Sequence, residues 1–462
     1  MGLLAQLALP GLVVLGSLSG PCAQGSQRLV RFDNGLELLV ESVPACQEMA
    51  LFLFVKNGWA QDPLDGTGTM HLVDHLVLTG ATPERKGWSY QQWQRQRTAA
   101  NSMTACRYTC YYSIGSRKAI SSDARRWAEV LAGKLRFGAR DLGRERPRVW
   151  TEARKLTTLV PGPMLQWRAR QRLLAGRPEG RVGVGLAQSL AKLSEAALRE
   201  AYLRSHHVGN ALLVALGRVD VERDLPFYRQ VFAGLKASAR EPLPTPTPPK
   251  SLEHAPASWA VRQVGGPFAT LAFAAPPLGS EEFPAFSVAA AVLRRRAMLS
   301  FPRGKTLGQA MFFPGYHSLL DFPEIAFLNW RGEDGGDLLV TQEKLQAWVK
   351  QQGRQPVRAA ELRFAQRQLR QTLDALPLEK LRAAQLARFP RLLYSLGLSR
   401  GLTQMGLLPE GLAARIAALD AKGVEAALQK HFAPERGAAL GLRPKQQESK
   451  PKQGAKPGGG GR

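Results

Sequence analysis

The sequence predicts an α/β protein made of two duplicated domains that are joined by a proline-rich linker. Predicted strands and amphipathic helices alternate along both halves of the chain, which is the pattern of a mixed α/β fold. The two halves end in the same order of helix, turn and strand, which indicates an internal duplication. The 462 residues are also too many for one hydrophobic core. We therefore expect two domains of about 200 residues each.

The first half opens with three predicted strands. Residues 27–43 contain two strand-like runs around Asn34-Gly35, and this dipeptide is a strong signal for a hairpin turn. The apolar run within residues 49–58 predicts a third strand. Together these runs indicate that a sheet begins close to the amino terminus of the folded chain.

Helical patterns then dominate the first half. They extend over about residues 67–96 and about residues 121–174, on either side of a predicted strand pair. Residues 210–219 form another apolar, strand-like run, and residues 221–235 follow it as an amphipathic helix. We expect the helices to cover the sheet that the strands form.

A proline-rich segment separates the two halves. Five prolines lie between Pro242 and Pro249, a density that neither a helix nor a sheet can continue through. Such a segment forms a semi-rigid, extended spacer. We place the linker at residues 239–254, the first domain at residues 26–238 and the second domain at residues 255–442.

The second half repeats the pattern of the first. Residues 268–277 predict a strand and residues 282–296 a helix. The closing segment, residues 420–444, runs from helix through turn to strand, in parallel with residues 194–217 of the first half. Residues 443–462 are polar, basic and rich in glycine and proline, so we expect a disordered tail.

Composition excludes several classes of protein. The chain has 63 Lys and Arg against 37 Asp and Glu, a formal net charge of +26. The basic residues are spread along helix faces with acids between them, and no nucleic-acid motif is present, so we do not expect a nucleic-acid partner. Four cysteines are too few for a disulfide scaffold. Cys106 and Cys110 are four apart in a predicted strand, which is too far for a disulfide between them.

Residues 1–25 have the pattern of a signal peptide. An apolar run extends from Leu3 to Leu18, and small residues follow it. The run is too short to span a bilayer, and no later apolar run is long enough for a membrane helix. We therefore expect an exported protein, periplasmic or extracellular. The position of Cys22 leaves open whether the mature chain is soluble or lipid-anchored.

A pair of histidines gives the clearest indication of a functional site in the sequence. His71 and His75 are four residues apart in a predicted helix, so both imidazoles share one face and can reach one metal ion. Asp74 lies on the same face. The candidate for a third ligand is Glu152, and Glu145 lies seven residues earlier on the same helical face. Taken alone, the histidine pair could also be two polar side chains on an exposed helix face that bind no metal.

The segment around these histidines resembles the insulinase/pitrilysin family of zinc metallopeptidases. His-x-x-Asp-His is similar to the inverted His-x-x-Glu-His motif of that family. Further matching positions extend through the first half, and the resemblance covers about residues 27–442. These positions are Gly58, Gly68, Gly80, Asn101, Thr104, Thr109, Tyr111, Glu145 and Glu152.

The resemblance implies a fold, a cofactor and a reaction. It implies two α/β roll domains, each a mixed sheet covered by helices, and one Zn²⁺ held by His71, His75 and Glu152. Asp74 would be the catalytic base, and Glu145 would be either a support for the zinc site or a solvated helix charge. The substrate would be a peptide or unfolded protein segment. It would add as a strand near Asn101 and Thr104.

Two departures from the family pattern affect the expected activity. The family has Glu where this chain has Asp74, and the shorter side chain withdraws the carboxylate by about 1 to 1.5 Å, a misplacement that can cost about a hundredfold in rate. The family also uses an Arg and Tyr pair in the second domain, but the best alignment places Pro302 and Gln309 there. The resemblance therefore implies a zinc-bearing subunit of a homo- or heterodimer with a related two-domain chain.

Two other interpretations stay open from the sequence. The chain could be a zinc-binding homologue of impaired activity that serves as a non-catalytic partner subunit. It could also be a basic exported binding protein that holds no metal. His206 and His207 match no ligand position, so we expect them to be solvated or to cap the chain at a turn.

Overall fold

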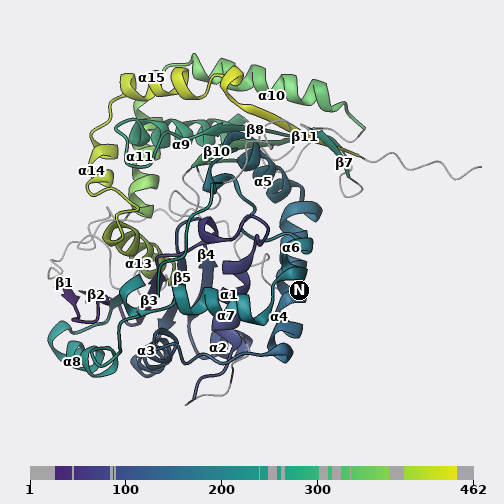
Figure 1. The fold of residues 1–462 in the computed structure, drawn as a ribbon. Helices are drawn as coiled ribbons and strands as arrows, with labels where there is room; N and C mark the ends of the chain where they lie inside the picture. Colours follow the sequence, from purple (N-terminus) through teal and green to yellow (C-terminus); the bar gives the residue numbers. More distant parts are fainter. Residues whose placement is uncertain are drawn as a thin grey trace, which may run out of the picture.

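The computed structural model describes residues 27–43, 46–83, 87, 90–238, 240–247, 258–261, 266–300, 311–314, 324–332, 335–373 and 390–444. The predicted signal peptide, Pro302 and Gln309 lie outside these residues. Within them the predicted fold class is confirmed. The chain forms two sheets of strands with helices packed on them, one sheet from each half of the sequence (Figure 1).

The first sheet is mixed and has six described strands in the order β1-β2-β6-β3-β5-β4. Its strands are β1 (Gln27–Arg31), β2 (Glu37–Ser42), β3 (Met49–Val55), β4 (Ala99–Thr104), β5 (Thr109–Gly115) and β6 (Ala211–Gly217). The predicted hairpin joins β1 to β2, and Gly35 takes a φ of 88° there, which favours glycine. β2 and β6 are parallel, while the other neighbours are antiparallel. Every residue of β3 and β6 is buried, as expected for central strands.

Helices of the first half cover one face of this sheet. They are α1 (Thr69–Thr79), α2 (Tyr90–Arg95), α3 (Arg117–Leu131), α4 (Ala139–Arg154), α6 (Ala187–Lys192), α7 (Glu195–Ser205) and α8 (Val221–Phe232). Helix α5 (Pro161–Leu173) also belongs to this half, but it packs on the second sheet, which is described below. Leu51, Leu53 and Val55 of β3 share a core with apolar residues of α1, α3, α7 and α8. The two long helical predictions are confirmed, but each is divided. α1 ends at Gly80. A non-helical segment at residues 132–138 separates α3 from α4, and a π-helical turn at Lys155–Leu159 separates α4 from α5.

A helix of the second half covers the other face. Helix α13 (Pro390–Gln404) packs against β3 and β6. Glycines on α13 meet the aromatic rings of β3. A Cβ atom added to Gly397 would clash with the ring of Phe52, and one added to Gly401 would clash with the ring of Phe54. One continuous hydrophobic core therefore extends from the first sheet into the second half.

The second sheet has five described strands in the order β7-β11-β8-β10-β9. These are β7 (Ser258–Val261), β8 (Phe268–Ala274), β9 (Met311–Pro314), β10 (Ile325–Arg331) and β11 (Ala438–Pro444). The described helices of this half besides α13 are α9 (Phe283–Ser300), α10 (Leu338–Gly353), α11 (Ala359–Thr372), α14 (Leu412–Ala417) and α15 (Ala421–His431). In Figure 1 the helices α9, α10, α11 and α15 lie around this sheet.

The repeated closing segment is confirmed in both halves. In the first half, α7 leads through a 3-10 turn at Val208–Asn210 into β6. In the second half, α15 leads through a 3-10 turn at Pro434–Arg436 into β11. The predicted start of the tail at residue 443 is wrong, because Arg443 and Pro444 pair with β7 as the end of β11. The rest of the predicted tail lies outside the described residues.

Residues 240–247 of the predicted linker form neither helix nor strand, as their prolines require. Side chains of the first half hold this segment in place. Arg204 donates to the carbonyl oxygens of Glu241 and Pro242 at 2.8 and 2.7 Å, and Gln61 donates to the Thr245 hydroxyl at 2.9 Å. The described part of the linker therefore follows the surface of the first half.

The prediction that Cys106 and Cys110 share a strand is wrong. Cys110 lies in β5, but Cys106 lies in the turn between β4 and β5, because the chain reverses there. Both are free cysteines, as is Cys46. None of the described helices is long and apolar enough to cross a membrane.

Candidate metal centre

Helix α1 presents both histidines on one face. The helix begins after Gly68, whose φ of 90° and close approach to Gly185 leave no room for a side chain. The ring centres of His71 and His75 lie 5.0 Å apart, with the ring planes nearly perpendicular. This is the result of the four-residue spacing, which places successive turns of one helix side by side.

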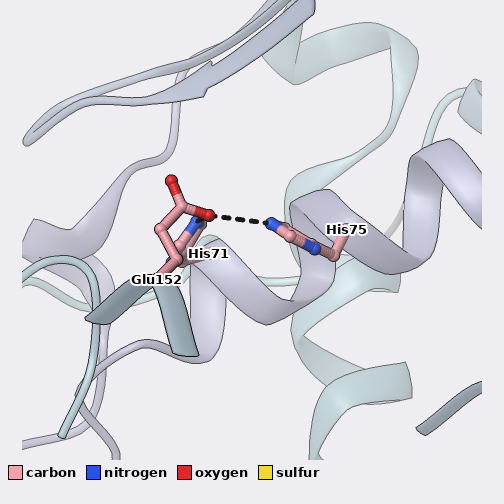
Figure 2. A group of neighbouring side chains, drawn as sticks. All are labelled: His71, His75 and Glu152. Atoms are coloured by element: carbon pink, nitrogen blue, oxygen red, sulfur yellow. Dashed lines mark ion pairs between the residues drawn. The ribbon is translucent and has the colours of Figure 1, made fainter. Parts of the chain in front are cut away.

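Glu152 of α4 completes the cluster. Its Oε2 atom lies 3.8 Å from Nε2 of His71 and 3.8 Å from Nε2 of His75. Figure 2 shows this carboxylate facing the two imidazoles from the neighbouring helix. One ligand atom from each of the three residues lies within 4.8 Å of the others. The structure thus brings together the three residues that the sequence singled out as metal ligands.

The donor set fits a zinc ion. Two imidazole nitrogens and one carboxylate oxygen are a ligand set of catalytic zinc sites, which keep a fourth position open. Ligands at about 2.1 Å from a tetrahedral ion lie about 3.4 Å from one another. The two observed separations between Glu152 and the histidine nitrogens, 3.8 Å each, are close to that spacing.

The other nitrogen of each imidazole faces an acceptor. Nδ1 of His71 lies 3.2 Å from the carbonyl oxygen of Val184, and Nδ1 of His75 lies 3.4 Å from a carboxylate oxygen of Glu145. Both acceptors favour a hydrogen on Nδ1 and leave the Nε2 lone pair for a metal ion. Partners of this kind fix the ring orientation and raise the basicity of the ligand. Nothing in the sequence pointed to Val184, which lies 113 residues from His71.

Glu145 is a buried group and not a solvated helix charge. Its side chain is 1% exposed, and it accepts hydrogen bonds from Arg144 at 2.7 Å and Arg148 at 2.9 Å. Burial by itself would raise the pKa of Glu145, but the hydrogen bonds from His75 and Arg144 lower it to about 2. Glu145 therefore stays ionised beside His75 at any pH near neutral.

Asp74 is buried beside the histidines, and its environment differs from that of Glu145. Its Oδ2 atom accepts a hydrogen bond from the Thr104 hydroxyl at 3.1 Å, while Oδ1 has no hydrogen-bond partner among the described residues. Burial raises the pKa of Asp74 to about 6, although the nearby charge of His75 opposes the rise. A carboxyl group with a pKa close to neutrality can both accept and release a proton.

Strand β4 carries the two residues that the sequence assigned to substrate binding. The structure places Thr104 in contact with Asp74. The side-chain oxygen of Asn101 accepts from the backbone N–H of Ser102 at 2.9 Å. Among the described strands, β4 lies at the end of the sheet order and pairs with β5. α1 packs against it.

The expectation that His206 is solvated or caps the chain is wrong. Its side chain is buried between α7 and the sheet, where Nε2 lies 2.9 Å from the Tyr111 hydroxyl and Nδ1 lies 2.7 Å from the Ser205 hydroxyl. Burial raises the pKa of the Tyr111 phenol well above 10, and the nearby charge of Asp74 adds to the rise. Two adjacent histidines before a turn indicated an exposed polar pair in the sequence, so the burial of His206 was not expected.

Comparison with known proteins shows what this chain is similar to. No protein-family model matches it. Its sequence is 26% identical over 230 residues to an uncharacterized zinc protease of Mycobacterium bovis, a match that covers 49% of this chain and 51% of that protein. The chain thus matches about half the length of this curated relative.

Solved structures share the fold. A protease from Helicobacter pylori matches with a TM-score of 0.73 and 16% identity, over 91% of this chain and 100% of that one. An M16 peptidase inactive domain from Pseudomonas fluorescens matches with a TM-score of 0.66 and 17% identity, over 91% and 98%. The periplasmic protease PqqL of Escherichia coli matches with a TM-score of 0.64 and 17% identity, over 93% of this chain and 48% of that one. The chain is thus similar in part of its sequence to a zinc protease, and it shares the fold of solved M16-type peptidases.

Proposed function

We propose that this chain is a zinc-dependent metalloendopeptidase that hydrolyses peptides or unfolded protein segments. One observation carries the proposal: His71, His75 and Glu152 converge from two helices on one point. The buried Asp74 shares helix α1 with the two histidines. A ligand cluster with an adjacent proton acceptor is what metal-assisted peptide hydrolysis requires.

Different residues would bind the metal and transfer the proton. His71, His75 and Glu152 would hold Zn²⁺, which would supply an activated water and polarise the scissile carbonyl. The Asp74 carboxyl group, which accepts a hydrogen bond from Thr104, would accept the proton of the water and return it to the leaving amine. Thr104 keeps the Asp74 carboxyl group in one orientation. The shorter reach of Asp compared with Glu predicts a slow reaction.

The substrate would bind along β4. This strand ends the sheet order among the described strands, and it passes Asp74 at Thr104. An extended peptide that adds to this edge would be held by main-chain hydrogen bonds, with Asn101 near one end of the strand. Binding through the main chain tolerates many side chains, which is consistent with action on unfolded segments.

We further propose that the chain works as the zinc-bearing subunit of a dimer with a related two-domain chain, its own domains spanning residues 26–238 and 255–442. Two observations support this. The chain matches 48% of the PqqL chain, and a second unit of similar size would complete an equivalent whole. The family's carbonyl-binding Arg and Tyr are also missing from the sequence at Pro302 and Gln309. The leader pattern and the periplasmic location of PqqL support export.

A second candidate function is a zinc-binding but non-catalytic partner subunit. The replacement of the family Glu by Asp74 favours it, and one fold neighbour is described as an inactive domain. The two candidates share the metal site and differ in whether the Asp74 carboxyl group transfers a proton.

Peptide hydrolysis by wild type, Asp74→Asn and Asp74→Glu separates the two candidates. Each protein is checked for zinc content and assayed with and without a related partner chain. We expect slow turnover by wild type, none by Asp74→Asn with zinc retained, and faster turnover by Asp74→Glu. An amide cannot accept the proton of the water, which explains the loss. Turnover that survives Asp74→Asn would refute the role of Asp74 as the proton acceptor. Zinc-loaded protein that hydrolyses no peptide in any of the three forms would favour the non-catalytic subunit.

A further inference from the structure

A carboxyl group from outside helix α1 caps the amino end of the helix. The helix follows Gly68, which has no side chain to cap it, and its first turn contains no acidic residue. Asp62 takes that place. Its Oδ2 accepts from the backbone N–H of Gly68 at 2.7 Å and its Oδ1 from that of Met70 at 2.8 Å. The Asp62 side chain is buried, so water does not compete for these N–H groups.

A positive charge from another helix meets the carboxyl end of α1. The last turn of α1 contains no basic residue. Arg126 of α3 is fully buried, and its Nη2 atom donates to the backbone carbonyl oxygens of Val77, Leu78 and Gly80 at 2.8, 3.2 and 3.0 Å. These carbonyl groups lie at the end of the helix, where partners within the helix run out.

The acceptor Asp62 and the donor Arg126 match the polarity of the two ends of α1. Backbone N–H groups at the start of a helix and carbonyl groups at its end carry partial positive and negative charge, so an anion is favoured at the start and a cation at the end. The effect is greater in a buried site than at a surface. Arg181 braces the amino-terminal side, because it donates to the carbonyl oxygens of Asp62 and Pro63 at 2.5 and 2.6 Å. The loop that carries Asp62 is therefore fixed as well.

We propose that Asp62 and Arg126 are positioning residues for the metal site: they fix the rotation and axial position of α1, and so the directions of His71 and His75 toward Glu152. This inference rests on the proposed metal site. His71 and His75 belong to α1, whereas Glu152 belongs to α4. A turn or slide of α1 relative to α4 separates the ligands even when every ligand is intact.

The test compares Asp62→Asn and Arg126→Gln with a matched control, Arg97→Gln. Arg97 is also buried in the first half, but its hydrogen bonds go to Asp123 and to residues outside α1. The zinc dissociation constant is measured by competition with a chromogenic chelator, and the geometry is read from the visible spectrum of the Co²⁺-loaded proteins. Thermal melting of the metal-free chains reports stability. Amide hydrogen exchange over residues 69–80 reports the order of α1 without any metal.

We expect Asp62→Asn and Arg126→Gln to weaken zinc binding about tenfold to a hundredfold, which is the range for residues that orient metal ligands. Their Co²⁺ spectra should change, and the α1 amides should exchange faster. Arg97→Gln should lower the melting temperature but keep zinc affinity within about twofold, because the hydrogen bonds described for Arg97 go to Asp123, Trp93, Gln96 and Ala119, which lie outside α1. Arg126→Lys keeps the charge and should recover part of the affinity. If Arg126→Gln does not fold, Arg126→Lys takes its place in the comparison.

Failure of the inference differs from failure of the proposed function. If wild type binds no zinc, the proposed function is wrong. Faster exchange of the α1 amides in Asp62→Asn and Arg126→Gln than in Arg97→Gln would then still support the two residues as anchors of α1. If the folded variants match the control in both zinc affinity and α1 exchange, the positioning role is overturned.

Discussion

Nδ1 of His75 lies 3.4 Å from a carboxylate oxygen of Glu145, a residue that shares helix α4 with the third member of the ligand cluster, Glu152. One helix thus supplies both a ligand and the group that orients another ligand. The Arg144 and Arg148 side chains hold Glu145 in its ionised form. The position of His75 therefore depends on α4 through a contact that is independent of any metal.

Glu145→Gln should weaken zinc binding about tenfold to a hundredfold, because a neutral amide does not increase the basicity of His75 as a carboxylate does. Chelator competition measures the change. Asp141→Asn is the matched control, since Asp141 is on the same helix and pairs with Arg144 but is not a partner of His75. Equal zinc affinity in Glu145→Gln and Asp141→Asn would show that Glu145 has no supporting role.

Gly397→Ala should destabilise the chain, because the new methyl group would meet the ring of Phe52 where the second half packs on the first sheet. Overpacking of this kind costs about 1 to 3 kcal/mol in the free energy of unfolding. Gly143→Ala is the control, since Gly143 lies within α4 and an added Cβ would meet nothing within 4 Å. There we expect a gain of up to about 1 kcal/mol from the better helix former. Chemical denaturation measures both, and a Gly397→Ala chain as stable as wild type would contradict the packing.

The stability of the chain should fall as the pH falls from 6.5 toward 3, in part because of His206. Burial lowers the pKa of His206 to about 3, with a smaller effect of His207 in the same direction. Over this range the unfolded chain binds a proton that the native chain does not, so acid favours unfolding. The contribution of this residue is about 2 kcal/mol at pH 5, from about 1.4 kcal/mol for each pH unit below 6.5.

His206→Gln tests that contribution. The amide can still accept from Tyr111 and donate to Ser205, but it does not titrate. Denaturant unfolding of wild type and variant at pH 7.5 and pH 5 should show a smaller loss of stability for the variant. Equal losses in both proteins would mean that His206 is already protonated, or unimportant, in the native chain.

Much of the fold could be predicted from local patterns. The hairpin at Asn34-Gly35, the buried strand at residues 49–55 and the repeated order of helix, turn and strand depend on short-range signals, and each was found in the structure. The breaks at residues 132–138 and 155–159 were missed, since both lie inside one predicted helical stretch. The packing of α13 on β3 depends on contacts between distant residues, which no local pattern reveals.

The candidate site was predictable to the extent that its members share a helix. His71, Asp74 and His75 follow from the spacing within α1, while Glu152 and Glu145 needed a family resemblance to connect them with α1. Val184, Asp62 and Arg126 act on α1 or its histidines from other segments through buried hydrogen bonds. Their roles depend on the folded arrangement, so the sequence gives no signal for them.

The zinc content of the purified full-length chain is the most direct test of the central claim. Wild type, His71→Ala and His206→Gln are dialysed against buffer without chelator, and metal is measured by mass spectrometry together with protein concentration. The ligand cluster predicts about one zinc per chain in wild type and in His206→Gln, and a loss of zinc in His71→Ala, because two remaining ligands do not hold the ion tightly. A wild-type chain without zinc, or zinc that remains at full occupancy in His71→Ala, would contradict the assignment of this site.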